Sequence, residues 1–138
     1  LLFKPIEING KLYMDGGVSD SLPFEKAFSD GCDKVIALLT RPRGYIKGYE
    51  KATPLVKLAY KKYPEFLKSF LSRPENYNNS VKKLYELEKE GKAFVLAPED
   101  VFGVGRTERD HAKLEKLYQE GYNECKKAEN ELLKFVSQ

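Results

Sequence analysis

Short apolar runs and longer amphipathic stretches alternate along the chain. Residues 35–40 and 93–97 are continuous apolar runs, which are typical of strands buried on both faces in a parallel sheet covered by helices. Residues 4–8 and 11–14 are shorter β-type runs, and the Asn9-Gly10 pair between them favours the positive φ angles of a tight type I′ turn. The pattern therefore predicts an N-terminal hairpin and two central strands.

Apolar residues that recur at intervals of three and four predict helices elsewhere. A short helix follows Pro23 and ends at Gly31, because proline is favoured in a first helical turn and glycine after a last one. Residues 55–71 show the same spacing, with a break or kink at Pro64. The polar residues 74–79 predict a connection that ends this helical region.

Two further helices complete the pattern. Residues 81–87 predict a helix that stops at Gly91. The longest periodic stretch follows Thr107, which has the spacing of a capping box with Asp110, and it extends to Phe135. Because helices alternate with buried strands, we expect the α/β class, with a hairpin, two central strands and four or five helices.

The strands are few for so many helices. Two central strands would leave helix and sheet faces uncovered, which suggests that further strands lie upstream of Leu1. The chain also begins with neither an initiator methionine nor a targeting signature. We therefore expect a piece of a longer protein that packs through an apolar face against an upstream half or a second copy of itself.

The composition is that of an ordinary folded domain. The chain has 138 residues, of which 41% are hydrophobic and 33% charged, and no apolar run approaches the ~20 residues that span a bilayer. Cys32 and Cys125 lie far apart without metal-ligand spacing, so we expect a reduced, cytoplasmic setting, with Cys32 filling the core. We expect no metal and no cofactor.

The charge is unevenly distributed. The net charge is only +3, but residues 41–73 contain nine Lys or Arg and two Glu, a net charge of +7. A basic stretch that also carries Leu and Phe can lie on an anionic membrane surface, or it can pack on the domain with its lysines outside. Both interpretations remain open. No recognition motif accompanies the stretch, so we expect no nucleic-acid partner.

The strongest chemical signal is Asp15, which follows a predicted strand and precedes Gly16 and Gly17. The strand would fix the backbone of Asp15, and the glycines would let a substrate or another backbone come close. A carboxylate beside a hydroxyl can orient it and accept its proton. However, Asp-Gly is also common turn chemistry, in which the aspartate side chain caps the backbone. On these residues alone, a catalytic base and a turn cap both remain open.

Residues 13–24 resemble the third conserved block of patatin-like phospholipases, in which a strand ends in Asp-Gly-Gly or Asp-Gly-Ala and a Leu-Pro pair follows, here Leu22-Pro23. Residues 35–42 and the tail at 108–122 resemble a bacterial branch of that family. The resemblance implies that Asp15 is the aspartate of a Ser–Asp dyad and that the two glycines form the active-site turn. It also implies the C-terminal part of a three-layer α/β/α fold.

The resemblance further implies how the chain is divided. Residues 1–40 would end the catalytic core, and residues 41–138 would form a mainly helical C-terminal region with one more strand. The family's Gly-x-Ser-x-Gly elbow and its glycine-rich oxyanion block precede the Asp-Gly-Gly block, and neither occurs in this sequence. We therefore assign no nucleophile to this chain. Ser19 and Ser21 lack an elbow context, and His111 has the charged neighbours of a surface residue.

Two functions are compatible with the sequence. The first is part of a lipid acyl hydrolase, a phospholipase or esterase that cleaves lipid carboxylic esters and is inactive as this chain alone. The second is a non-catalytic module that docks on a partner or, through residues 41–73, peripherally on a membrane. A pocket around Asp15 would favour the first function, and an exposed turn carboxylate would favour the second.

Overall fold

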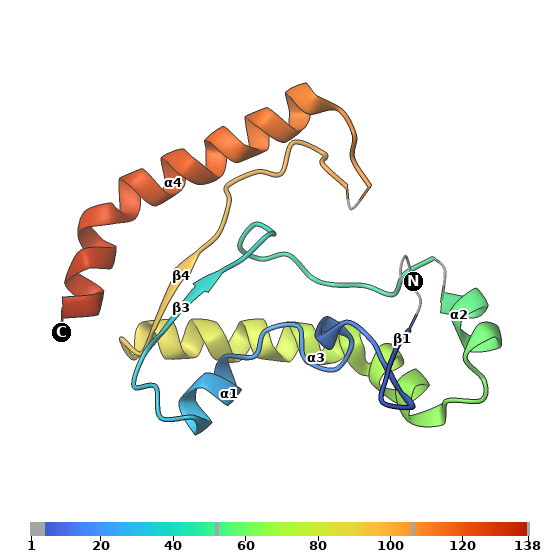
Figure 1. The fold of residues 1–138 in the computed structure, drawn as a ribbon. Coiled ribbons are helices and arrows are strands. Elements are labelled where there is room, and N and C mark those ends of the chain that lie inside the picture. The colour runs from blue at the N-terminus through green and yellow to red at the C-terminus, as the bar shows by residue number, and fades with distance from the viewer. Residues whose placement is uncertain (1–4, 52, 106, 138) are drawn as a thin grey trace. The chain divides into compact units, whose positions relative to one another are not determined.

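The computed structural model describes residues 5–51, 53–105 and 107–137 (Figure 1). Helices and strands alternate, as expected for the α/β class, and the predicted hairpin, two further strands and four α-helices are present in this part of the chain. Leu1–Phe3, and Lys4 at the start of the predicted hairpin, lie outside the described residues. The elements are β1 Ile6–Ile8, β2 Lys11–Tyr13, the 3-10 helix η1 Gly16–Val18, α1 Phe24–Ser29, β3 Val35–Leu38, α2 Thr53–Ala59, α3 Pro64–Lys89, β4 Ala93–Leu96 and α4 His111–Ser137.

The chain forms two compact units, each built from two separate stretches. Leu1–Pro23 and Ile46–Lys83 form the first unit, and Phe24–Tyr45 and Leu84–Gln138 form the second. The boundary between the units falls within α3. The expected division at residue 40, between the end of a catalytic core and a helical C-terminal region, stays a prediction.

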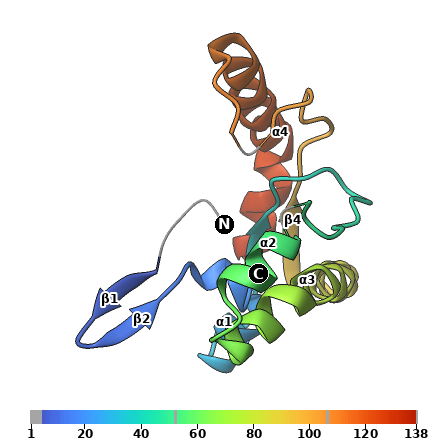
Figure 2. The same ribbon diagram turned by 90° about the vertical axis from the view of Figure 1, so that its right-hand side faces the viewer.

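The hairpin of the first unit has the predicted turn. Asn9 and Gly10 have φ values of 51° and 73°, the left-handed conformation that a type I′ turn requires at both positions. The strands pair antiparallel with Ile6 opposite Tyr13, and Figure 2 shows them as a two-stranded ribbon. Every residue of β1 and β2 is exposed, so the hairpin is held through the turn that follows it and not through its faces.

The core of the first unit joins three segments that are distant in sequence. Val18 of η1, Val56 of α2 and Phe70 of α3 are buried against one another. Aromatic rings extend this cluster along the start of α3, with the Tyr60 and Phe66 ring centroids 4.7 Å apart. The burial of Val18 fixes the turn that contains Asp15, because Val18 lies only three residues further along the chain.

Helix α3 runs through the stretch that we expected to be a polar connection, and that prediction is wrong. Pro74 has no N–H to donate to the carbonyl of Phe70, a defect that costs about 3 kcal/mol inside a helix. Tertiary contacts offset this cost, because Pro74 is itself buried. The side chain of Asn78 accepts a hydrogen bond from the Lys47 N–H at 2.8 Å and donates one to the Lys47 carbonyl at 3.1 Å.

The second unit is organised by a parallel pair of strands. β3 and β4 pair in register from Val35 opposite Ala93 onward, and the Leu39 N–H extends the ladder with a bond to the Leu96 carbonyl at 2.8 Å. Arg43 then fixes the chain beyond β3. Its guanidinium donates to both carboxylate oxygens of Glu88, at 2.8 and 2.7 Å, and the hydrogen bonding with Glu88 raises the pKa of Arg43.

One face of this sheet is open along β3, which corrects the prediction that both strands are buried on both faces. In β3, Ile36 is 47% exposed and Leu38 is 71% exposed. In β4, Ala93 and Val95 are buried, while the other two strand residues are half-buried. Helix α4 lies along β4, and the Phe94 and Phe135 rings pack in a tilted arrangement at a centroid distance of 5.6 Å. The apolar surface is therefore larger than the cover that the described residues provide.

The start of α4 differs from the predicted capping box. The side chain of Asp110 caps the helix, because its Oδ1 accepts the Ala112 N–H at 2.9 Å, and Thr107 lies before the helix. Asp110, and not Thr107, is the N-cap because its carboxylate accepts hydrogen bonds from the free N–H groups of the first turn. None of the helices in the described chain combines the length and the apolar character that a membrane crossing needs.

The open sheet face predicts how the isolated chain behaves. Replacing Ile36 and Leu38 together by Thr should reduce self-association in ultracentrifugation and the binding of a dye that reports apolar surface, because both side chains face solvent. The free energy of unfolding should change by less than about 1 kcal/mol. As a control, Leu84→Ala should cost about 2–5 kcal/mol, because Leu84 is completely buried. A monomeric wild-type chain without dye binding would contradict the prediction.

Candidate functional site: the Asp15 turn

Asp15 lies two residues beyond β2 and begins η1 as its N-cap. Its Oδ1 accepts the Gly17 N–H at 2.9 Å, and its carbonyl accepts the Val18 N–H at 3.1 Å. The side chain is exposed, and its second carboxylate oxygen forms no hydrogen bond with the described residues. The turn thus holds one oxygen of the carboxylate and leaves the other open to a proton donor.

Gly17 is the position where this turn is tight. A Cβ placed on Gly17 would lie 3.3 Å from Oδ1 of Asp15 and 3.9 Å from a terminal nitrogen of Arg73. A Cβ on Gly16 would have no atom within 4 Å. Neither glycine has a positive φ, so the two positions differ in space and not in backbone conformation. The neighbours of Gly17 are side-chain atoms of Asp15 and Arg73, so the predicted close approach of a substrate or another backbone stays a prediction.

Arg73 of α3 places a positive charge beside the turn. Its side chain is only 18% exposed, and it pairs with Glu50 at a long N···O distance of 3.4 Å. Its Nε lies 3.5 Å from the Ser21 hydroxyl, which itself donates to the Gly17 carbonyl at 2.8 Å. The guanidinium therefore supports the backbone that carries Asp15. Sequence reasoning missed Arg73, because 58 residues separate it from Asp15.

The other polar residues near the turn are engaged with the backbone. The Ser19 hydroxyl donates to the Gly16 carbonyl at 3.0 Å, so neither Ser19 nor Ser21 donates to Asp15. Asp20 makes a bond of the same kind as Asp15, accepting the Leu22 N–H at 3.0 Å. Asp100 does the same with Phe102 at 2.9 Å. The capping bond of Asp15 thus recurs at Asp20 and Asp100, and Asp15 differs from them by its two glycines and by Arg73.

The remaining predicted residues lie elsewhere. His111 is exposed at the first position of α4, as we predicted. Cys125 is a free, exposed thiol on α4. Cys32 is also free and exposed, so the prediction that it fills the core is wrong. It lies in the turn between α1 and β3.

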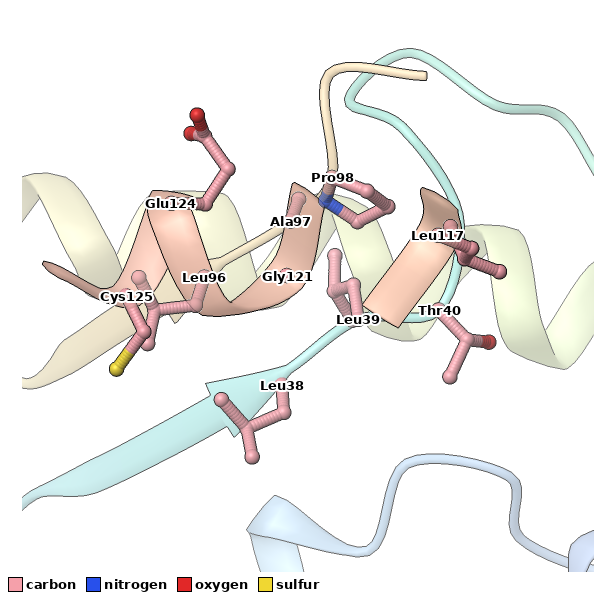
Figure 3. A pocket seen from close by; sticks show the side chains of 10 residues that line it. All are labelled: Leu38, Leu39, Thr40, Leu96, Ala97, Pro98, Leu117, Gly121, Glu124 and Cys125. Atoms are coloured by element: carbon pink, nitrogen blue, oxygen red, sulfur yellow. The ribbon is translucent and has the colours of Figure 1, made fainter. Parts of the chain in front are cut away.

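The second unit contains an apolar pocket where the β3–β4 pair ends. Its volume is about 390 Å³, and Figure 3 shows that residues of β3 and the chain just after it, of the end of β4 and of α4 line it. A Cβ on Gly121 would meet no atom within 4 Å, so this glycine keeps the helix side of the pocket open. The lining is almost wholly apolar, apart from Thr40, Glu124 and Cys125. Such a pocket can take an apolar chain or the side chains of another protein segment.

Residues 63–137 match a protein family described as a domain of unknown function, DUF6363. The chain belongs to the DUF6363 family. No curated protein and no solved structure matches it. The DUF6363 segment begins one residue before α3 and includes Arg73, β4 and α4, whereas the Asp15 turn lies outside it. Membership in the family therefore assigns no role to Asp15.

The DUF6363 segment also brings three carboxylates together on the second unit. One oxygen from each of Glu99, Glu120 and Glu124 lies within 4.8 Å of the others. Lys127 donates to Glu124 at 2.6 Å, and this hydrogen bond, with the charges of the three glutamates, raises the pKa of Lys127. An ammonium group thus already offsets part of the negative charge of this cluster.

The geometry of the turn predicts that its two glycines tolerate alanine differently. Gly17→Ala should push Oδ1 of Asp15 from its capping position and lower the free energy of unfolding by about 1 kcal/mol. Gly16→Ala is the matched control and should be neutral or slightly stabilising, because the added methyl group meets open space and restricts the unfolded chain. Urea unfolding of both variants measures the difference. Equal stabilities would show that the Asp15 cap does not hold the turn.

Proposed function

We propose that this chain is part of a patatin-like serine hydrolase that cleaves carboxylic esters of lipids, with Asp15 as the base of its Ser–Asp dyad. The observation that carries the proposal is the state of the Asp15 carboxylate. One oxygen is fixed by the Gly17 N–H, and the other is open. The turn itself is anchored by the burial of Val18. A carboxylate held in this way is ready to accept a proton without first reorganising.

In the proposed reaction, a serine hydroxyl from the part of the protein that carries the Gly-x-Ser-x-Gly elbow attacks the ester carbonyl. Asp15 accepts the hydroxyl proton as the new C–O bond forms. When the tetrahedral intermediate collapses, the proton passes to the departing alcohol and an acyl-serine remains, which water then hydrolyses. Backbone N–H groups of the oxyanion block stabilise the negative charge on the carbonyl oxygen. This chemistry needs no metal or cofactor.

The open surfaces fit the same proposal. The exposed face of β3 and the apolar pocket beside it are surfaces that a larger, three-layer α/β/α core would cover. The serine-bearing part of the protein would then pack against the exposed side of Asp15. The predicted cytoplasmic location with peripheral membrane contact belongs to this proposal as well.

A non-catalytic docking module is the second candidate. The observation that favours it is the exposure of Asp15, whose capping bond is shared by Asp20 and Asp100. In that case Asp15 serves only its own turn, and the basic residues 41–73 carry the function. The two candidates differ in what happens when the Asp15 carboxylate is replaced by an amide.

Asp15→Asn in the native protein should lower the turnover of a lipid ester by about 10²–10⁴-fold, because the amide keeps the size of the side chain but cannot accept a proton. Labelling of the serine by a fluorophosphonate, which reacts with an activated serine hydroxyl, should slow in parallel. Mass spectrometry should place the label on a Gly-x-Ser-x-Gly peptide outside residues 1–138.

Asp20→Asn is the matched control, because Asp20 is also exposed and makes the same type of capping bond. It should keep the wild-type rate. The isolated chain, purified free of contaminating esterases, should show no turnover. If Asp15→Asn kept wild-type activity, Asp15 would be only a turn cap, and the non-catalytic docking module would be favoured.

A further inference from the structure

Helix α2 of the first unit exposes two leucine side chains to solvent. Val56 is buried in the core, whereas Leu55 and Leu58 are 71% and 68% exposed. At 100° per residue, Leu58 lies about 160° around the helix from Val56, so the burial of one directs the other away from the protein. This exposure is therefore built into the packing of α2, which Figure 1 shows as a short separate helix.

Lysines surround the two leucines. Lys57 lies between them in sequence and beside Leu58 around the helix, and Lys61 and Lys62 follow in the turn that leads to α3. All three are exposed, and none forms an ion pair or hydrogen bond within the described part of the chain. By contrast, lysines of α4 are paired, for example Lys126 with Glu129 at 3.2 Å. The exposed side chains of Leu55, Lys57, Leu58, Lys61 and Lys62 are called the α2 surface below.

We propose that the α2 surface docks this protein on an anionic phospholipid membrane. Two leucines can enter the boundary between head groups and acyl chains, while the three ammonium groups bind the phosphates around them. The charge complementarity identifies the occupant, because the lysines have no acidic partner of their own. The two exposed leucines favour a membrane over a nucleic acid or another polyanion, because only a membrane has an apolar interior that they can enter.

The energetics predict measurable changes in affinity. A basic side chain near an anionic membrane changes the partition coefficient by about fivefold, so removing three lysine charges should weaken binding by about 100-fold. Each leucine that leaves the acyl boundary should cost roughly a further tenfold. The inference does not rest on the proposed hydrolase activity, because binding is measured without turnover.

The test is sedimentation of the complete 138-residue chain with phosphatidylglycerol–phosphatidylcholine vesicles and with pure phosphatidylcholine vesicles. Wild type should bind the anionic vesicles, and salt should weaken the binding. The variants Lys57→Gln/Lys61→Gln/Lys62→Gln and Leu55→Gln/Leu58→Gln should each lose most of it. Glutamine retains helix propensity, and circular dichroism should show unchanged helix content.

Matched controls are available on α4. Leu133→Gln/Val136→Gln replaces two exposed apolar residues at the same spacing. A triple Lys→Gln variant removes three charges that are paired with glutamates. Both controls should bind like wild type; the triple variant changes Lys113, Lys126 and Lys127.

Three outcomes would overturn the proposal. The first is no preference for anionic over neutral vesicles, and the second is that the α2 variants bind as well as the α4 controls. The third is binding that needs the lysines but not the leucines. That result would show attraction to negative charge alone, without entry of the leucines into the bilayer.

Discussion

The packing of Val18 against Val56 and Phe70 is the contact on which the first unit depends. It joins the turn after the hairpin, helix α2 and helix α3, and partly buried residues of α3 and the turn before it pack around it. The same contact orients both surfaces to which we assign a function. Burial of Val18 fixes the turn that presents the Asp15 carboxylate, and burial of Val56 directs Leu58 toward solvent. Changes in this small core should therefore affect both surfaces together.

In the second unit, the sheet has more apolar surface than the described helices cover. The two-stranded parallel sheet has α4 along β4, but Ile36 and Leu38 of β3 remain exposed and the pocket at the strand ends is open. Parallel sheets are ordinarily covered on both faces, because their strands are apolar on both sides. The apolar run of residues 35–40 therefore leaves apolar side chains exposed on β3. In our proposal, the rest of the hydrolase core covers this surface.

Local signals in the sequence predicted most elements, and long-range contacts explain the errors. Asn9-Gly10, Gly31 and Gly91 act through their own backbone angles, so their turns could be read directly from the chain. Pro74 is different, since its helical conformation depends on its burial and on the bonds that Asn78 makes with Lys47. Local rules could not anticipate either contact.

The candidate site shows the same division. The sequence singled out Asp15 and the two glycines, because they belong to one short motif, but it did not show which glycine occupies the tight position. It could not identify Arg73 beside them, or the pocket that Leu38 and Leu117 both line, because folding alone brings these residues together. The exposure of Asp15 was likewise a property of packing and not of the motif.

The most direct test of the account is a crystal structure of the native protein after reaction with a fluorophosphonate lipid analogue. The account predicts that the labelled serine lies beside the Asp15 turn, with its Oγ about 3 Å from the free carboxylate oxygen and the Gly17 capping bond intact. A labelled serine whose nearest base is another residue, with the Asp15 carboxylate turned to solvent, would contradict the assignment of Asp15 as a catalytic residue.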